Sequence, residues 1–107
     1  TENIMIAQTI LQQMGGHRFA LTTGSKDFIG LGNGLLMSLS RNKTSANRLE
    51  IIYDEGLDLY NMRFYRKTFS KKTFESKTKD IAKYEGIYFD MLEEIFTEVT
   101  GLNTRLF

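Results

Sequence analysis

The 107-residue chain contains neither cysteine nor proline. The lack of cysteine excludes disulfides, zinc–thiolate sites and cysteine nucleophiles. The lack of proline means that no X–Pro isomerisation slows folding. No apolar run approaches the roughly 18 residues of a transmembrane helix, so we expect no membrane partner. Residues 1–14 show no basic n-region and no cleavage site, so we expect no signal peptide and a cytoplasmic protein.

The composition is that of a globular protein. Hydrophobic residues make up 41% of the chain and charged residues 25%, which is an ordinary balance. The length is near the common size of one domain, and no repeat, low-complexity stretch or linker divides the chain. We therefore expect residues 1–107 to form a single compact domain.

Both ends of the chain carry helical periodicity. Near the N-terminus, apolar residues recur at spacings of three and four, and Gly15 and Gly16 are expected to end that helix. These apolar residues are Ile4, Ala7, Ile10, Leu11 and Met14. Residues 81–99 show the same periodicity over a wider apolar stripe, and Gly101 follows as the expected cap. We therefore predict one N-terminal and one C-terminal helix.

The middle of the chain alternates apolar and polar residues, as strands do. The alternation predicts strands over residues 18–23, 35–40, 48–54, 59–68 and, more weakly, 73–79. Residues 24–34 are expected to form a glycine-rich connection. The predicted order is α-β-β-β-β-(β)-α. It favours an α+β fold with a single antiparallel sheet of four to five strands and both helices packed on one face.

The glycine-rich connection does not match a phosphate-binding loop. Its glycines Gly30, Gly32 and Gly34 are spaced G-x-G-x-G and precede a strand. A dinucleotide fingerprint requires G-x-G-x-x-G before a helix, and a P-loop requires Gly-Lys-Ser or Gly-Lys-Thr. We therefore expect a loop or wide hairpin that needs unusual backbone dihedral angles.

Two further features invite a catalytic or metal site. His17, the only histidine, has the pKa range of a general base, but it follows a helix stop and the chain lacks G-x-S-x-G. Asp54, Glu55 and Asp58 surround Gly56 and offer oxygens to a hard cation, but without EF-hand spacing. We expect a surface histidine and an acidic turn. We predict no catalytic residue, no metal and no cofactor, and a protein that is not an enzyme.

Charge is sorted into two adjacent blocks. Residues 63–83 contain eight basic and two acidic residues, a net of +6, whereas residues 84–99 contain five acidic and no basic residues, a net of −5. Strand alternation places Arg63, Tyr65 and Lys67 together on an outer face. A ring among cations can stack on a base while the cations hold phosphates.

The basic block therefore predicts a nucleic-acid-binding surface. Its candidate residues are Arg63, Tyr65, Lys67, Lys71, Lys72, Lys77 and Lys79, which Arg41, Lys43 and Arg48 could extend. The same lysines would also protect an exposed sheet edge, so both explanations stay open. The partner on this hypothesis is nucleic acid.

The acidic block predicts a different surface. It consists of Glu85, Asp90, Glu93, Glu94 and Glu98, and we expect it on the outside of the C-terminal helix. Such a face would mimic phosphates and dock on a basic host protein, with Asp90, Glu93, Glu94 and Glu98 as candidate contacts. It would alternatively pair with the basic hairpin of a second copy and form a homodimer by charge complementarity.

Several stretches resemble known sequences. They are residues 9–19 (TILQQMGGHRF), 21–28 (LTTGSKDF), 84–88 (YEGIY), Met91-Leu92 and 100–106 (TGLNTRL). Together they resemble a group of short proteins of unknown function from phages and other mobile elements of bacteria. The resemblance implies a mobile-element context and no particular activity. We predict a small non-enzymatic accessory protein that binds nucleic acid, or alternatively a module that binds or inhibits a host factor.

Overall fold

The computed structural model describes residues 2–104, with side chains from Met5 onward. The five strands form one antiparallel sheet in the order β1-β2-β3-β4-β5. They are β1 (Lys26–Leu31), β2 (Gly34–Ser38), β3 (Arg48–Asp54), β4 (Leu59–Ser70) and β5 (Glu75–Ile87). The helices are α1 (Glu2–Met14), α2 (His17–Thr23), the 3-10 turn η1 (Phe89–Met91) and α3 (Leu92–Thr100).

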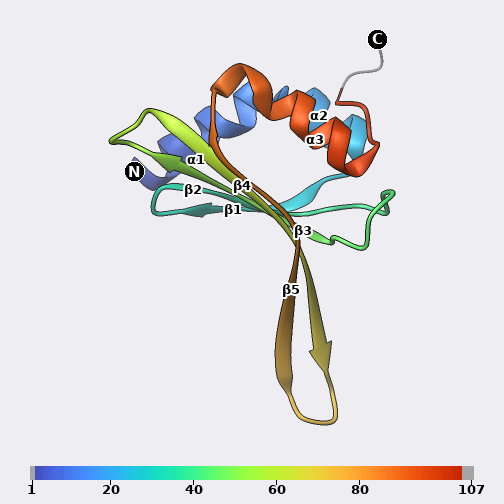
Figure 1. The fold of residues 1–107 in the computed structure, drawn as a ribbon. Coiled ribbons are helices and arrows are strands. Elements are labelled where there is room, and N and C mark those ends of the chain that lie inside the picture. Colours follow the sequence, from blue (N-terminus) through green and yellow to red (C-terminus); the bar gives the residue numbers. More distant parts are fainter. Residues whose placement is uncertain (1, 105–107) are drawn as a thin grey trace.

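The helices lie together on one side of the sheet (Figure 1). This arrangement confirms the predicted α+β class, the single antiparallel sheet and the helices at both ends on one face. Within residues 2–104, no helix has both the length and the apolarity to cross a membrane. Arg105 and Leu106, which belong to the resembling stretch 100–106, lie outside the described residues, as does the side chain of Ile4.

The core forms between the helices and the inner face of the sheet. Its fully buried side chains include Ile10 and Met14 of α1, Leu92 and Phe96 of α3, and Met37, Leu49, Ile51, Met62 and Phe64 of the sheet. The Phe96 ring stands edge-on to Phe19 of α2 at 4.9 Å between ring centroids. Both predicted helix ends are confirmed: α1 stops before Gly15, and Gly101 closes α3 in the left-handed conformation.

Residues 18–23 form a helix, so the prediction of a strand there is wrong. Phe19 and Thr23, four residues apart, are buried, whereas Leu21 is 71% exposed. The Thr23 hydroxyl donates a hydrogen bond to the Phe19 carbonyl, a bond that an extended strand cannot make because residues four apart are about 13 Å from each other. The buried residues are therefore four apart, as in a helix. Phe19 and Leu21, which a strand would place on the same face, do not pack on the core together.

Residues 24–34 contain the strand β1, which was not predicted, and a hairpin, which was one of the two forms predicted for this connection. Gly32 and Asn33 are the two residues of a tight hairpin that pairs Leu31 with Gly34. The unusual dihedral angles predicted for this segment occur at Gly24 (φ 73°) and Asp27 (φ 55°), whereas Gly32 and Gly34 do not have a positive φ. A Cβ on Gly34 would lie 2.2 Å from the Ile51 carbonyl oxygen. Glycine is needed here because β2 and β3 approach too closely for any side chain.

Residues 81–87 belong to β5, so the predicted C-terminal helix begins too early. The fifth strand exists, but it runs to Ile87 instead of ending near Lys79. Its pairing with β4 is irregular at two points, near Ile81 and near Gly86. Such bulges add one residue to the strand. Because of the two bulges, the residues of β5 that face the core, Ala82, Tyr84 and Ile87, are two and three residues apart. This spacing resembles that of the apolar residues of a helix.

Candidate nucleic-acid interface

The β4–β5 hairpin extends well beyond the rest of the sheet. β3 pairs with β4 only as far as Arg48 opposite Tyr65, whereas β4 and β5 remain paired to Ser70 opposite Glu75. Residues 66–79, here called the arm, therefore form a two-stranded ribbon. The arm projects away from the helices (Figure 1). Every one of its residues is exposed.

The base of the arm is braced against the loop between β2 and β3. The Asn47 side chain accepts from the Lys67 amide at 2.8 Å and donates to the Lys67 carbonyl at 2.9 Å. The Asn47 amide also donates to the Tyr65 carbonyl, and Arg66 donates to the Ser45 carbonyl. These bonds hold the arm at its root, while the ribbon beyond Lys67 and Thr78 rests on its own cross-strand pairing.

Tyr65 is not presented to solvent, so that part of our prediction is wrong. Its exposed fraction is only 6%. The Arg63 guanidinium carbon lies 4.1 Å from the centroid of the Tyr65 ring, and Arg63 also makes a 2.6 Å ion pair with Asp80. Arg63 therefore covers the ring and is itself neutralised. Burial raises the pKa of Tyr65 above its ordinary value.

The cations of the arm lie on both faces of the ribbon. Directly paired residues of antiparallel strands share a face. Lys67 pairs with Thr78 on the face that carries Tyr65, whereas Lys79 pairs with Arg66 and Lys77 with Thr68 on the opposite face. Arg63, Tyr65 and Lys67 therefore share one face, as predicted, whereas Lys77 and Lys79 lie on the opposite face of the ribbon. Lys71 and Lys72 occupy the loop at the tip.

The arm concentrates positive charge that the whole-chain balance conceals. It carries six basic residues and one acidic residue, Glu75, a net of +5, so the remaining residues sum to −4 within the chain total of +1. Within the described part of the chain, none of the arm lysines makes an ion pair. Their charges are therefore available to an external anion.

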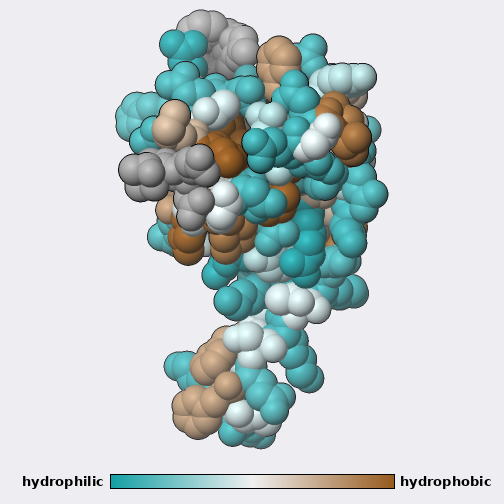
Figure 2. All heavy atoms as spheres, turned by 90° about the vertical axis from the view of Figure 1, so that its left-hand side faces the viewer, coloured by the Kyte–Doolittle hydropathy of each residue, from teal (hydrophilic) through white to brown (hydrophobic). Residues whose placement is uncertain are grey.

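Sequence reasoning missed two apolar residues at the tip of the arm. Phe69 and Phe74 are 58% and 78% exposed, and their rings contact each other at 6.3 Å between centroids. Figure 2 shows apolar side chains gathered at the end of the protruding arm among hydrophilic ones. The available signal was that both phenylalanines stand in a lysine-rich stretch where no core pattern requires them.

Of the basic residues that were predicted to extend the basic surface, only Arg48 lies next to the arm. Arg48 lies opposite Tyr65 in the β3–β4 pairing and donates to the Asn47 carbonyl, so it adjoins the root of the arm. The Lys43 amide instead donates to the Thr100 carbonyl, which places Lys43 at the end of α3. Arg41 is exposed in the same loop.

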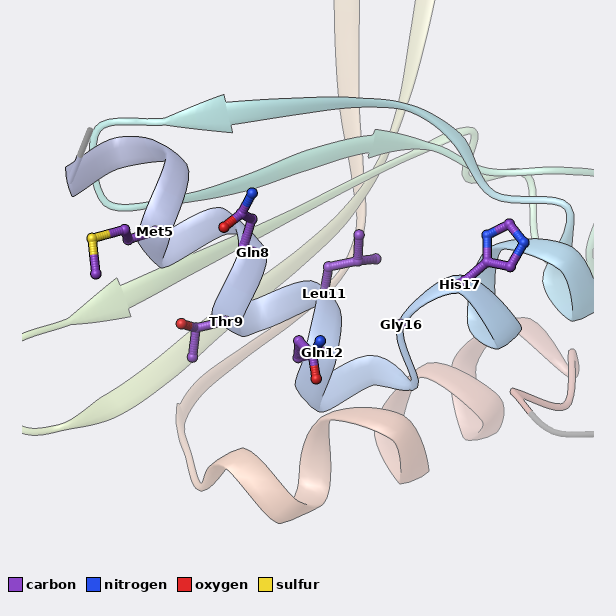
Figure 3. A pocket seen from close by; sticks show the side chains of 7 residues that line it. All are labelled: Met5, Gln8, Thr9, Leu11, Gln12, Gly16 and His17. Carbon is purple, nitrogen blue, oxygen red and sulfur yellow. The ribbon is translucent and has the colours of Figure 1, made fainter.

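His17 is the first residue of α2 and is exposed, as expected. It lines a surface depression of about 480 Å³ with six residues, most of them from α1: Met5, Gln8, Thr9, Leu11, Gln12 and Gly16. Figure 3 shows the His17 ring well apart from the Thr9 hydroxyl, at the end of the depression opposite Met5. Among the described residues, no carboxylate lines this depression, whereas Glu93 lines a neighbouring depression of about 620 Å³ together with His17 and Arg18.

The acidic residues around Gly56 form the predicted turn between β3 and β4. The Asp54 carboxylate accepts from the Leu57 amide at 3.2 Å, and the Tyr53 hydroxyl donates to Asp58 at 2.6 Å. Both carboxylates are thus used within the turn. Among the described residues, no group of three His, Asp or Glu side chains is arranged to hold a metal ion.

The hydrogen bond between Tyr53 and Asp58 can be tested by titrating the Tyr53 hydroxyl. The hydrogen bond to Asp58 raises the pKa of Tyr53 to about 12. The folded pKa lies above the unfolded value of about 10, so the stabilisation is complete below pH 10 and is lost as the pH rises through 12. Asp58→Asn keeps a residue that tolerates the left-handed backbone at this position and removes the charge. We expect phenolate absorbance of this variant to develop at lower pH than in wild type; superimposable titrations would contradict the assignment.

The acidic candidates are divided among several elements. Glu85 lies on β5 and Asp90 in η1, so neither belongs to α3 as predicted. Glu93 is half-buried and accepts a 2.6 Å hydrogen bond from the Thr104 hydroxyl. Glu94 and Glu98 are exposed and line a depression of about 640 Å³ with Glu93, Thr97 and Thr104. Within residues 2–104, the exposed carboxylates of η1 and α3 are those of Asp90, Glu94 and Glu98.

Comparisons of the chain with protein-family models, with curated proteins and with solved structures found no match.

Proposed function

We propose that this chain is a small non-catalytic accessory protein of a phage or other mobile element, and that it binds nucleic acid through the arm. The observation that carries the proposal is the exposed ribbon with six cations and one carboxylate, whose lysines make no ion pair within residues 2–104. The resemblance of both chain ends to short proteins of mobile elements supports the biological context.

Binding would be driven by the phosphates. Each lysine that contacts a phosphate releases a condensed counterion, and this release favours binding at low salt. Lysine is a flexible point charge without fixed geometry, so the contacts would be independent of sequence. The bonds from Asn47 hold the root of the arm before any partner arrives, which limits the ordering that binding requires.

Protection of a sheet edge explains these lysines less well. The strands of the arm are paired only with each other, so their outer edges are open and edge protection can explain Lys67, Lys77 and Lys79. It does not explain Lys71 and Lys72, which stand in a loop that has no strand edge to protect. Protection of an edge by lysines also does not explain why Phe69 and Phe74 are exposed.

The direct test is fluorescence anisotropy with labelled DNA. The full chain would be titrated into single-stranded and double-stranded oligonucleotides of mixed sequence at low salt. We expect saturable binding that weakens steeply as salt is added. No change in anisotropy with either oligonucleotide at low salt would refute the proposal.

A second candidate function rests on the acidic residues of η1 and α3. Glu94 and Glu98 are four residues apart and share one side of α3, and Asp90 precedes them in η1; all three are exposed. Together they would present three carboxylates to a basic host protein.

Charge reversal tests this second candidate. The variant Glu94→Lys/Glu98→Lys avoids Glu93, whose bond to Thr104 is structural. If these carboxylates bind a host protein, pull-down from lysate should lose that partner, while a Glu85→Lys variant on β5 should retain it. Identical partners for all three proteins would count against this second candidate.

A further inference from the structure

The backbone at the tip of the arm adopts an unfavourable conformation. Lys71–Phe74 form the loop between Ser70 and Glu75, closed by a hydrogen bond from the Phe74 amide to the Ser70 carbonyl at 2.7 Å. Phe74 has a φ of 56°, in the left-handed region where glycine or asparagine is favoured and a bulky residue is rare. The sequence thus places an exposed ring where a smaller residue would fit better. Strain of this kind points to function.

The two rings are also costly to expose. Phe69 and Phe74 contact each other at the tip, but this contact leaves more than half of each side chain in water. Phe69 lies opposite Ser76 in the pairing, not opposite Phe74, so the rings do not form a cross-strand pair that would set the register. A stabilising role for the hairpin alone does not account for them.

The distribution of cations favours a duplex over a flat surface. From Arg66 to Ser70 the ribbon rises by about 13 Å at 3.3 Å per residue. Cations lie on both faces within this length, with Lys67 on one face and Arg66, Lys77 and Lys79 on the other. A membrane interface takes up an apolar group to a depth of only about 5–10 Å, so cations at the root would stand clear of its headgroups. A ribbon within a groove meets phosphates on both sides.

The form of the duplex can also be inferred. The major groove of B-form DNA is about 12 Å wide and admits a two-stranded β-ribbon. The deep, narrow major groove of A-form RNA does not admit side chains. The arm therefore fits duplex DNA. Proteins that bind the minor groove insert apolar side chains between base steps, which unstacks the bases and kinks the helix. The phenylalanines at the end of the arm are exposed apolar groups of the same kind.

From these observations we propose that Phe69 and Phe74 form a wedge that unstacks and bends double-stranded DNA held by the lysines of the arm. This inference rests on the proposed function, because the wedge acts only on DNA that the arm has bound. It adds a consequence of binding, deformation of the duplex, that phosphate contacts alone do not produce.

The test separates binding from bending. A duplex with a donor and an acceptor dye at its ends and a 2-aminopurine at its centre would be mixed with the full chain. Anisotropy reports binding, energy transfer reports bending, and 2-aminopurine fluorescence reports unstacking. We expect wild type to bring the ends together, with a kink of about 20–90°, and to brighten the 2-aminopurine.

Three variants make the test specific. Phe69→Thr/Phe74→Asn keeps every cation and suits the strand and left-handed positions. It should bind roughly tenfold more weakly, as loss of stacking predicts, with unchanged salt dependence and without bending. Phe69→Leu/Phe74→Leu retains an apolar wedge and should still bend the duplex. Leu21→Thr/Leu57→Asn alters equally exposed apolar residues elsewhere and should match wild type.

Each contrary result has a distinct meaning. Binding of wild type without bending or unstacking would overturn the wedge and leave the proposed function intact. Failure to bind any nucleic acid would refute both. Tighter binding to single strands that depends on the phenylalanines would overturn the wedge in favour of base stacking. Phenylalanine-dependent flotation with vesicles of phosphatidylcholine and phosphatidylserine, with the DNA unbent, would overturn it in favour of a lipid surface.

Discussion

Replacing Phe96 with alanine is expected to lower the free energy of unfolding by about 3–5 kcal/mol. Phe96 of α3 is fully buried, and its ring contacts Phe19 of α2 and Phe64 of β4 at centroid distances of 4.9 and 6.4 Å. Alanine would leave a cavity where α2, α3 and the sheet meet. The loss adds the transfer free energy of the ring to the cost of the unfilled space.

Urea unfolding followed by far-UV circular dichroism measures this change, since the chain has no tryptophan to serve as a fluorescent probe. Leu21→Ala is the matched control, because Leu21 is 71% exposed and surface substitutions usually change stability by less than about 0.5 kcal/mol. A loss of less than about 1 kcal/mol for Phe96→Ala would show that α3 does not pack on the sheet as described.

Neutralising the arm is expected to weaken DNA binding roughly a hundredfold at low salt. The variant Lys71→Gln/Lys72→Gln/Lys77→Gln removes three of the six cations of the arm and no buried side chain. Glutamine retains most of the side-chain length and can still donate hydrogen bonds. The loss would therefore report the charges and not the shape of the ribbon.

The control variant loses the same net charge, but at three cations that lie outside the arm. Arg18→Gln/Lys26→Gln/Arg41→Gln alters three exposed cations on α2, on β1 and in the β2–β3 loop. Its affinity should stay within a few-fold of wild type if binding is localised in the arm. Equal losses for the two triple variants would show that only overall charge matters. Matching unfolding curves would confirm that neither variant has lost its fold.

Strands with regular alternation were predictable from the sequence. β3 was predicted with its observed bounds, Arg48–Asp54, because Leu49 and Ile51 are buried on a face that the pattern marks unambiguously. β4 was predicted from the same alternation of Tyr60, Met62 and Phe64. A strand that packs one face on a core and pairs regularly on both sides keeps a period of two.

The errors arise where tertiary contacts override local patterns. α2 has only seven residues, too few to show a period, and its helicity depends on burial of Phe19 and Thr23. The bulges near Ile81 and Gly86 break the alternation of β5. No local pattern reveals a bulge, because the extra residue is accommodated through the partner strand.

The candidate site was only partly predictable for the same reason. The lysines could be identified from charge alone, but their faces depend on the register that the four-residue loop Lys71–Phe74 sets. A shift of one residue moves a side chain to the other face. Likewise, Tyr65 follows strand alternation, yet only the structure shows that Arg63 covers it.

The central claim is that the arm binds nucleic acid through phosphate contacts, and the salt dependence of duplex binding tests it most directly. The logarithm of the association constant should fall linearly with the logarithm of salt concentration. If all six cations of the arm contact phosphates, the slope approaches about −5 at roughly −0.9 per contact, and it should become shallower by about 3 in the triple lysine variant. A slope near zero in wild type, or the same slope in that variant, would contradict the account.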